Sequence, residues 1–230
     1  MGFYQQFIEW VIYHGGLYVV LLIIFAETGL FVGFFLPGDS LLFTTGIYIN
    51  EVASNFFNVH YDVSVFFNFH YAVILLFIII ASFAGNVAGY WFGYKTGPAM
   101  FKWKDGFFFK RKYLTRAKEF YEHYGNGTIF FAKFLPIIRT FAPPVAGIVQ
   151  MPKKNFILYN IAGSICWVTL MILGGHFLQS WIDKKFGFSL KDHLGLITII
   201  IVLITTLPIL YKLLFRKKKK MLNPAIQQVK

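Results

Sequence analysis

The chain has 230 residues, of which 57% are hydrophobic, 20% aromatic and only 14% charged, and its mean hydropathy is +0.60. Charged residues make up about a quarter of a soluble domain, so this composition excludes an ordinary soluble domain and predicts one integral membrane domain. The net charge of +12 does not indicate nucleic acid as a partner, because the basic residues cluster just beyond apolar stretches, where they meet anionic lipid headgroups. The single cysteine, Cys166, excludes an intramolecular disulfide and a cysteine-based metal site.

The first interrupted stretch is AETGLFVGFFLPGDSLLF, which begins like an apolar membrane helix. Pro37 and Gly38 then break the helical pattern, because proline lacks the N–H that a helix interior needs and glycine disfavours a helix. We therefore expect a re-entrant hairpin over about residues 20–46 that breaks at these two residues. Residues 1–16, which contain no Lys or Arg, are expected to form an N-terminal interfacial segment ahead of a single membrane domain at 17–215.

Further apolar stretches are long enough to cross the hydrocarbon core, which needs about 20 residues at about 1.5 Å of rise per residue. We expect transmembrane helices over about residues 71–94, 156–180 and 194–215. The first of them carries glycines at four-residue spacing, which lie on one face of a helix and allow another helix to approach closely. These helix-packing residues are Gly85, Gly89 and Gly93.

Two basic blocks predict the orientation. Residues 95–118 and the tail at 216–230 are rich in Lys and Arg, and the positive-inside rule places both in the cytoplasm. Two full spans lead to the tail, so a complete third crossing at 128–151 would put one basic block outside. A re-entrant hairpin over about 128–151 restores the parity, and prolines supply the breaks that it requires: Pro136, Pro143 and Pro144.

The two expected hairpins enter from opposite faces of the membrane and lie in opposite halves of the chain. Interrupted segments in corresponding positions of two halves are typical of an inverted repeat with a substrate site near the midplane. The sequence therefore predicts an all-α integral membrane protein, built from transmembrane helices plus two opposed re-entrant hairpins that are related as an inverted repeat.

Four charged residues lie inside the expected hairpins: Glu27 and Asp39 in the first, and Lys133 and Arg139 in the second. Charge at membrane depth is costly unless it is paired or hydrated, and it marks a functional site. A helix broken at Pro136 can turn both bases inward. The fork of Arg139 suits a phosphate and Lys133 offers a point charge, while the carboxylates can exchange protons.

An alternative is purely structural. In it, Glu27 with Arg139 and Asp39 with Lys133 are buried ion pairs that fix the hairpins to each other. Enzymatic chemistry is less favoured, because the chain has no nucleophile elbow, phosphate loop or dinucleotide fingerprint and its histidines lack a metal-ligand spacing. We therefore expect no catalytic residue, no metal and no cofactor, and we predict that the protein is not an enzyme.

Three motifs resemble those of the DedA family, also called SNARE-associated or VTT-domain membrane proteins. They are ETGLFVGFFLPGDSLLFTTG, GNVAGYWFGYKTG and FFAKFLPIIRTFAPPVAGIVQMPKKNFILYNIAGSICW, and the resemblance covers about residues 20–180. It implies recycling of a polyprenyl-phosphate carrier, dependence on the proton-motive force and, in eukaryotic relatives, phospholipid scrambling. The resemblance assigns the essential acids to Glu27 and Asp39 and the essential arginines to Lys133 and Arg139. Lys133 departs from the family's usual arginine, since it keeps the charge without the bidentate fork.

The function expected from the sequence is a membrane transporter or flippase for a lipid phosphate, undecaprenyl phosphate above all, coupled to protons. Lys133 and Arg139 would bind the phosphate, and Glu27 and Asp39 would carry protons. The alternatives are a proton-coupled carrier of a small solute or drug cation, a phospholipid scramblase, a lipid-phosphate enzyme and an envelope scaffold. The expected partners are the lipid phosphate, protons and membrane lipids, without nucleic acid. The expected location is a bacterial inner membrane with a cytoplasmic C-terminus, and the oligomeric state stays open, a homodimer being one option.

Overall fold

The computed structural model describes residues 16–29, 38–58, 69–100, 121 and 127–187. All regular structure in these ranges is α-helical, which confirms the predicted fold class. The helices are α2 (Gly16–Gly29), α3 (Gly38–Ile47), α4 (Ile49–Phe57), α5 (Phe69–Met100), α7 (Thr128–Ala132), α8 (Pro136–Ile148) and α9 (Lys153–Phe186). The predicted interfacial segment, apart from Gly16, as well as the span at 194–215 and the basic tail lie outside the described residues.

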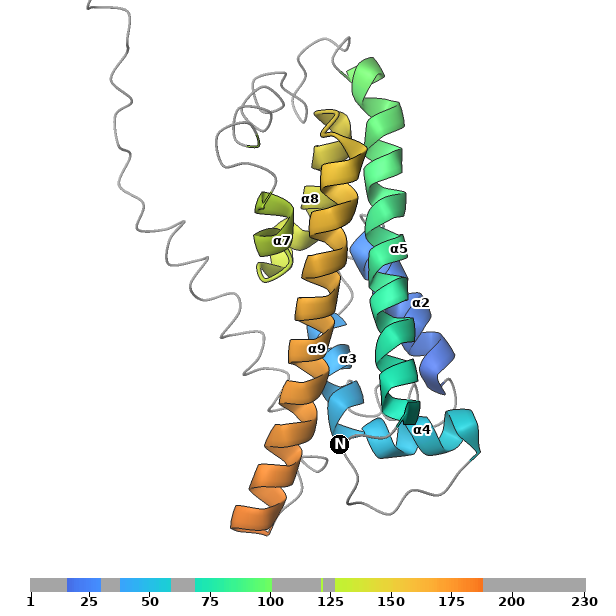
Figure 1. The fold of residues 1–230 in the computed structure, drawn as a ribbon, viewed down its shortest axis with the longest axis vertical. Helices are drawn as coiled ribbons and strands as arrows, with labels where there is room; N and C mark the ends of the chain where they lie inside the picture. Colours follow the sequence, from blue (N-terminus) through green and yellow to red (C-terminus); the bar gives the residue numbers. More distant parts are fainter. Residues whose placement is uncertain (1–15, 30–37, 59–68, 101–120, 122–126, 188–230) are drawn as a thin grey trace, which may run out of the picture.

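Two long helices, α5 and α9, lie side by side along the length of the molecule (Figure 1). Among the described residues, the stretches that are long and apolar enough to cross a membrane are Phe69–Gly97 and Lys153–Lys185, and they contain the spans predicted at 71–94 and 156–180. The two helices are antiparallel, since the C-terminal end of α5 and the N-terminal end of α9 lie at the same end of the molecule. They form the frame on which the shorter helices pack.

Helices α2 and α3 occupy one half of this frame. Helix α2 packs along α5 and ends at Gly29, where a Cβ atom would lie 2.5 Å from the carbonyl oxygen of Gly85 at the middle of α5. Helix α3 begins beside the middle of α9, where Trp167 donates a hydrogen bond to Asp39, and it then follows α9 toward the C-terminal end of that helix. Helix α4 continues from α3 and lies across the same end of the molecule.

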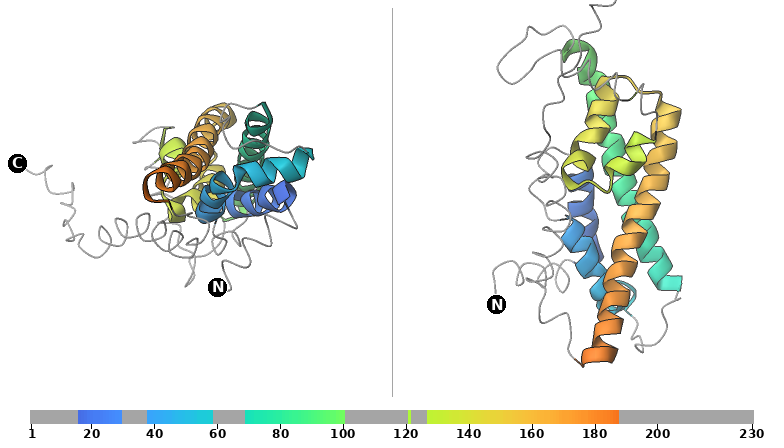
Figure 2. Two further views of the ribbon diagram at one scale, coloured as in Figure 1. Left: turned by 90° about the horizontal axis from the view of Figure 1, so that it is seen from below. Right: turned by 90° about the vertical axis from the view of Figure 1, so that its left-hand side faces the viewer.

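Helices α7 and α8 occupy the opposite half (Figure 2). Helix α7 packs on α9, and α8 packs on α5. Along α8, Pro144 lies against Gly93 and Ile148 lies against Gly97, so α8 leads away from the middle of α5 toward the C-terminal end of that helix. Each half of the chain thus places its first short helix on its own long helix and its second short helix on the long helix of the other half.

This arrangement brings the inner ends of α2, α3, α7 and α8 to the middle of the α5–α9 frame from opposite ends. It is the arrangement that two opposed hairpins require, although residues 30–37, including Pro37, lie outside the described residues. That the two helix pairs are re-entrant hairpins within a bilayer stays a prediction, as does the cytoplasmic position of the basic blocks.

The second helix pair is broken just before Pro136, one of the three prolines at which the sequence predicted a break. Helix α7 ends at Ala132, Leu135 is extended with φ −114° and ψ 102°, and Pro136 is in the first turn of α8. A residue that precedes proline is disfavoured from the helical region, so Pro136 explains this break.

Pro143 and Pro144 are not breaks, because both lie inside α8, and that part of the prediction was wrong. They remove two N–H donors, yet α8 continues because Pro144 is packed against α5. A Cβ atom on Gly89 would lie 3.3 Å from Cδ of Pro144, and one on Gly93 would overlap its carbonyl oxygen. Neighbouring helices commonly stabilise proline inside a membrane helix in this way.

The glycine face of α5 is confirmed as a surface for close helix packing. At Gly85 a Cβ atom would lie 2.5 Å from the carbonyl oxygen of Phe25 in α2, while Gly89 and Gly93 face Pro144 in α8. A side chain as small as alanine would therefore separate α5 from helices of both halves.

The buried side chains divide into two apolar clusters with polar residues between them. One cluster joins α2, α3 and α4 to α5 and α9, including Ile78 and Trp167. The other joins α7 and α8 to the opposite ends of the same long helices, including Tyr90 and Phe156. The polar and charged residues buried between them include Glu27, Asp39, Ser82, Asn86, Lys133, Arg139, Asn160 and Ser164.

Candidate functional site

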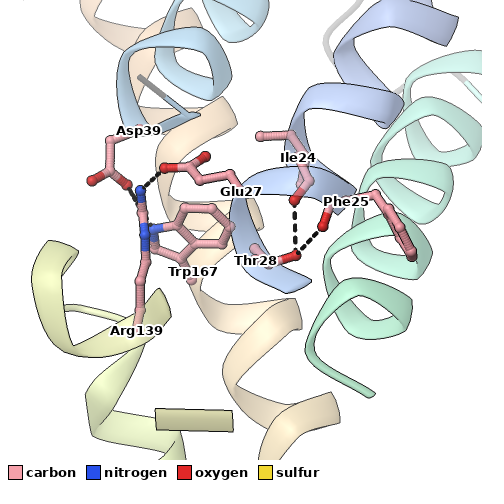
Figure 3. Close-up of polar contacts among 7 residues, drawn as sticks. All are labelled: Ile24, Phe25, Glu27, Thr28, Asp39, Arg139 and Trp167. Atoms are coloured by element: carbon pink, nitrogen blue, oxygen red, sulfur yellow. Dashed lines mark hydrogen bonds and ion pairs between the residues drawn. The ribbon is translucent and has the colours of Figure 1, made fainter. Parts of the chain in front are cut away.

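Arg139 forms the centre of a buried charge cluster at the junction of the short helices. Its Nη2 donates to Oε1 of Glu27 from α2, and its Nη1 donates to Oδ1 of Asp39 from α3 (Figure 3). Glu27, Asp39 and Arg139 are 2%, 9% and 7% exposed. The charges predicted from the two halves of the chain therefore meet in space, and both terminal nitrogens of the arginine are taken by carboxylates.

Trp167 in α9 contacts two members of this cluster. Its indole Nε1 donates to Oδ1 of Asp39 at 3.1 Å, and Cζ of Arg139 lies 4.6 Å from the centroid of its ring. An arginine over an aromatic face gains a cation–π interaction. Trp167 is 1% exposed, so it holds Asp39 and the guanidinium in one fixed arrangement.

Gly38 has a packing role in addition to its position at the start of α3. The carboxylate of Glu27 occupies the space that a Cβ atom at residue 38 would need. A glycine is therefore required where α2 and α3 meet, because any side chain would displace Glu27 from Arg139.

Lys133 lies in a separate polar environment, between α5 and α9. Its ammonium donates to Oγ of Ser164 at 2.5 Å and to Oγ of Ser82 at 3.2 Å, and the residue is 5% exposed. Gly163 makes room for its stem, since a Cβ atom there would lie 3.0 Å from Cδ of Lys133. Within the described ranges, Lys133 forms no ion pair.

Two asparagines complete this environment. Asn86 in α5 and Asn160 in α9 lie 2.7 Å apart through their amide groups, and Ser164 donates to Oδ1 of Asn160 at 3.4 Å. Turning the amide of Asn86 by 180° places its oxygen 2.5 Å from Nζ of Lys133 and its nitrogen 2.9 Å from the carbonyl oxygen of Thr28. This orientation of the Asn86 amide gives the Lys133 ammonium a third acceptor. The assignment of one amide orientation or the other follows from the surrounding hydrogen-bond network.

The structure changes the pairing that the sequence suggested. Glu27 does pair with Arg139, but Asp39 also pairs with Arg139, and Lys133 contacts neutral groups. The expectation that a break near Pro136 turns both bases inward is confirmed, since Lys133 and Arg139 are both buried.

Sequence reasoning missed the neutral partners and Trp167. The sequence does contain a pattern that indicates the neutral partners of Lys133. Two apolar helices each carry a pair of polar residues four positions apart, which lie on one helix face. In α5 the pair is part of SFAGN, and in α9 it is part of NIAGS. The two antiparallel helices therefore present the same residues in reverse order, and serine meets serine as asparagine meets asparagine.

Comparison with known proteins places the chain in a family. The model of the VTT domain matches residues 36–177. Protein DedA of Escherichia coli is 35% identical over 202 residues, which cover 87% of this chain and 83% of that protein. An uncharacterized membrane protein of Mycobacterium tuberculosis is 35% identical over 191 residues, covering 83% and 75% of the two chains, and the E. coli inner membrane protein YqjA is 26% identical over 193 residues, covering 82% and 80%. No solved structure matches.

The fold and the buried cluster therefore define a helical membrane protein of the VTT-domain class. Within that class the chain belongs to the DedA family, as the three motifs indicated.

Proposed function

We propose that the protein is a proton-coupled transporter or flippase for a lipid phosphate, with undecaprenyl phosphate as the expected substrate. The observation that supports this function best is the position of Arg139, a phosphate-binding type of side chain, buried between two carboxylates where opposed helix pairs meet. Interrupted helices that meet at the middle of a membrane protein are typical of transport sites.

The geometry suggests how protons and phosphate compete. While Glu27 and Asp39 are ionised, they occupy both terminal nitrogens of Arg139. Protonation of either carboxylate removes its negative charge and weakens its bond to the guanidinium. A phosphate oxygen can then replace it, so acidification favours binding of the anion at Arg139. Nε of Arg139 has no hydrogen-bond partner among the described residues, and it offers one further donor to the anion.

The proposed location is a bacterial inner membrane, with the basic loop and the C-terminus in the cytoplasm. Lys95 at the end of α5 and Lys153 and Lys154 at the start of α9 are exposed at one end of the molecule, which is the end assigned to the cytoplasm. In a Cys166→Ala background, single cysteines at positions 154 and 184 should react with an impermeant reagent from opposite sides. Labelling of position 154 from the outer side of the membrane would overturn this orientation, and labelling of both from one side would contradict α9 as a span.

Transport can be measured in liposomes that contain the protein and a short fluorescent polyprenyl phosphate. We expect a pH gradient to drive movement of the headgroup in the wild type. Glu27→Gln and Asp39→Asn keep the shape of each side chain but cannot ionise, so transport in these variants should no longer follow the gradient. Thr45→Val is the matched control, because within the described part of the chain its buried hydroxyl bonds only to the carbonyl oxygen of Leu41 in its own helix, at 2.7 Å.

The same preparation separates the alternative functions. Movement that is unaffected by the gradient in the wild type and in both amide variants would contradict proton coupling and indicate a passive scramblase. Release of inorganic phosphate from the lipid would indicate an enzyme. A wild-type protein that moves only a cationic solute would identify a solute carrier.

A further inference from the structure

The four neutral residues around Lys133 form a layer that neither the charge motifs nor the comparisons assign to a function. We call Ser82, Asn86, Asn160 and Ser164 the polar layer. All four are buried, at 0%, 3%, 0% and 0% exposure. They come from the two long helices, whereas the partners of Arg139 come from α2 and α3, so the polar layer is distinct from the carboxylate cluster.

The chemistry of the polar layer suits an anion as well as an ammonium. Hydroxyl and carboxamide groups both accept and donate hydrogen bonds. Toward Lys133 they accept, as Ser82 and Ser164 do in the structure. The same groups can donate to the oxygens of a phosphate while the ammonium supplies the opposite charge. Such a set of donors around one cation matches a phosphomonoester, and it offers an uncharged alcohol no charge–charge attraction.

The two buried cations differ in their readiness to take an anion. Arg139 is shielded by two carboxylates, which also repel a phosphate. No carboxylate contacts Lys133 within the described residues, and only neutral groups would have to rearrange. We propose that the phosphate group of the lipid binds first at Lys133, with the polar layer donating hydrogen bonds to its oxygens, before protonation releases Arg139. This inference rests on the proposed function, and it names the residues that recognise the headgroup.

The test is equilibrium binding to the purified full-length chain in lipid nanodiscs at neutral pH, without a pH gradient. The ligands are a short-chain polyprenyl phosphate, the corresponding alcohol and inorganic phosphate. The Ser82→Ala/Ser164→Ala variant removes two donors to a charged group, and we expect its affinity for the polyprenyl phosphate to fall by about tenfold or more. Lys133→Met should abolish binding under these conditions. Thr45→Val should bind as the wild type does.

Several results would overturn the inference. If the double serine variant loses thermal stability but binds the phosphate with wild-type affinity, the polar layer is only a brace between α5 and α9. Equal binding of the alcohol and the phosphate would show that the headgroup is not recognised here.

The other arms separate this inference from the proposed function. Binding of inorganic phosphate that depends on Lys133 and both serines, in a protein that moves no lipid, would support the subsite and contradict lipid transport. Lipid transport that is unchanged in the double serine variant would support the proposed function and overturn the subsite.

Discussion

Arg139 and Lys133 are two buried cations on either side of one helix break, but their surroundings are of opposite kinds. Arg139 binds two carboxylates from the short helices α2 and α3, whereas Lys133 binds neutral groups from the long helices α5 and α9. Removal of the two cations should therefore affect the stability of the protein to different extents. A buried carboxylate is costly to leave without its cation, whereas neutral hydroxyl and amide groups can form hydrogen bonds with one another.

The same difference distinguishes the contacts that protonation can release from the contacts that hold the two long helices together. The ion pairs join the inner ends of α2, α3 and α8, so releasing them loosens contacts between the two halves of the chain. The polar layer joins α5 to α9 directly. We infer that proton binding changes how α2, α3 and α8 pack against one another, while α5 and α9 keep their packing.

The largest expected effect is that of Arg139→Gln. This change leaves Glu27 and Asp39 buried without a cation, which should lower the free energy of unfolding by about 3–5 kcal/mol and abolish transport. Denaturant unfolding of the purified protein in detergent would measure the loss. The triple variant Arg139→Gln/Glu27→Gln/Asp39→Asn removes all three charges and should recover most of the stability without recovering transport.

Lys133→Met is the matched comparison for this prediction. The long apolar side chain leaves only neutral partners, which already contact one another through Ser82 with Ser164 and Asn86 with Asn160. We expect a change in the free energy of unfolding of about 1 kcal/mol or less, again with loss of transport. A destabilisation as large as that of Arg139→Gln would contradict the distinction between the two cations.

Gly163→Ala sharpens the comparison, because it perturbs Lys133 without touching a charge. The new Cβ atom would lie 3.0 Å from Cδ of Lys133 and 3.4 Å from Cα of Phe130, so the stem of the lysine must give way and its bonds to the polar layer are disturbed. Overpacking of this kind costs about 1–3 kcal/mol, and we expect weaker phosphate binding in nanodiscs.

Gly174→Ala is the control on the same helix, since its Cβ atom would lie 3.6 Å from a ring atom of Phe43, an ordinary contact. If both glycine variants weaken phosphate binding equally, the close packing at Gly163 has no specific effect on Lys133.

Hydropathy and helix breakers predicted the parts of this fold that depend on composition. The spans at 71–94 and 156–180 are apolar throughout, and the glycine face of α5 follows from four-residue spacing alone, so both could be read from the sequence. The four charged residues were identified for the same reason, since charge in an apolar stretch is conspicuous.

The sequence did not predict what depends on contacts between distant segments. Pro143 and Pro144 have the chemistry of helix breakers, but their packing against the glycines of α5 decides that α8 continues. The partner of Asp39 depends on which of the two bases lies beside α3. Ser82 and Asn86 are unremarkable in an apolar span until Asn160 and Ser164 lie opposite them.

The smallest expected effect is that of Trp167→Phe, which tests how much of the Arg139 arrangement depends on one hydrogen bond. Phenylalanine keeps an aromatic face beside the guanidinium but removes the N–H that donates to Asp39 at 3.1 Å. A hydrogen bond of this kind contributes about 0.5–1.5 kcal/mol, or more to a charged group, so the free energy of unfolding should fall only slightly. Among the described residues, Arg139 would then be the remaining hydrogen-bond partner of the Asp39 side chain, so this carboxylate should leave Arg139 more easily.

Transport in this variant, measured in the same liposomes, should therefore be faster than in the wild type at the same pH gradient. Trp167→Leu, which also removes the aromatic face, is the comparison that separates the ring from its N–H, and it should lower stability further. If Trp167→Phe leaves the transport rate unchanged while Trp167→Leu destabilises the protein, the indole acts through packing and the cation–π contact only. In that case Arg139 would be the residue among the described contacts that positions the Asp39 carboxylate.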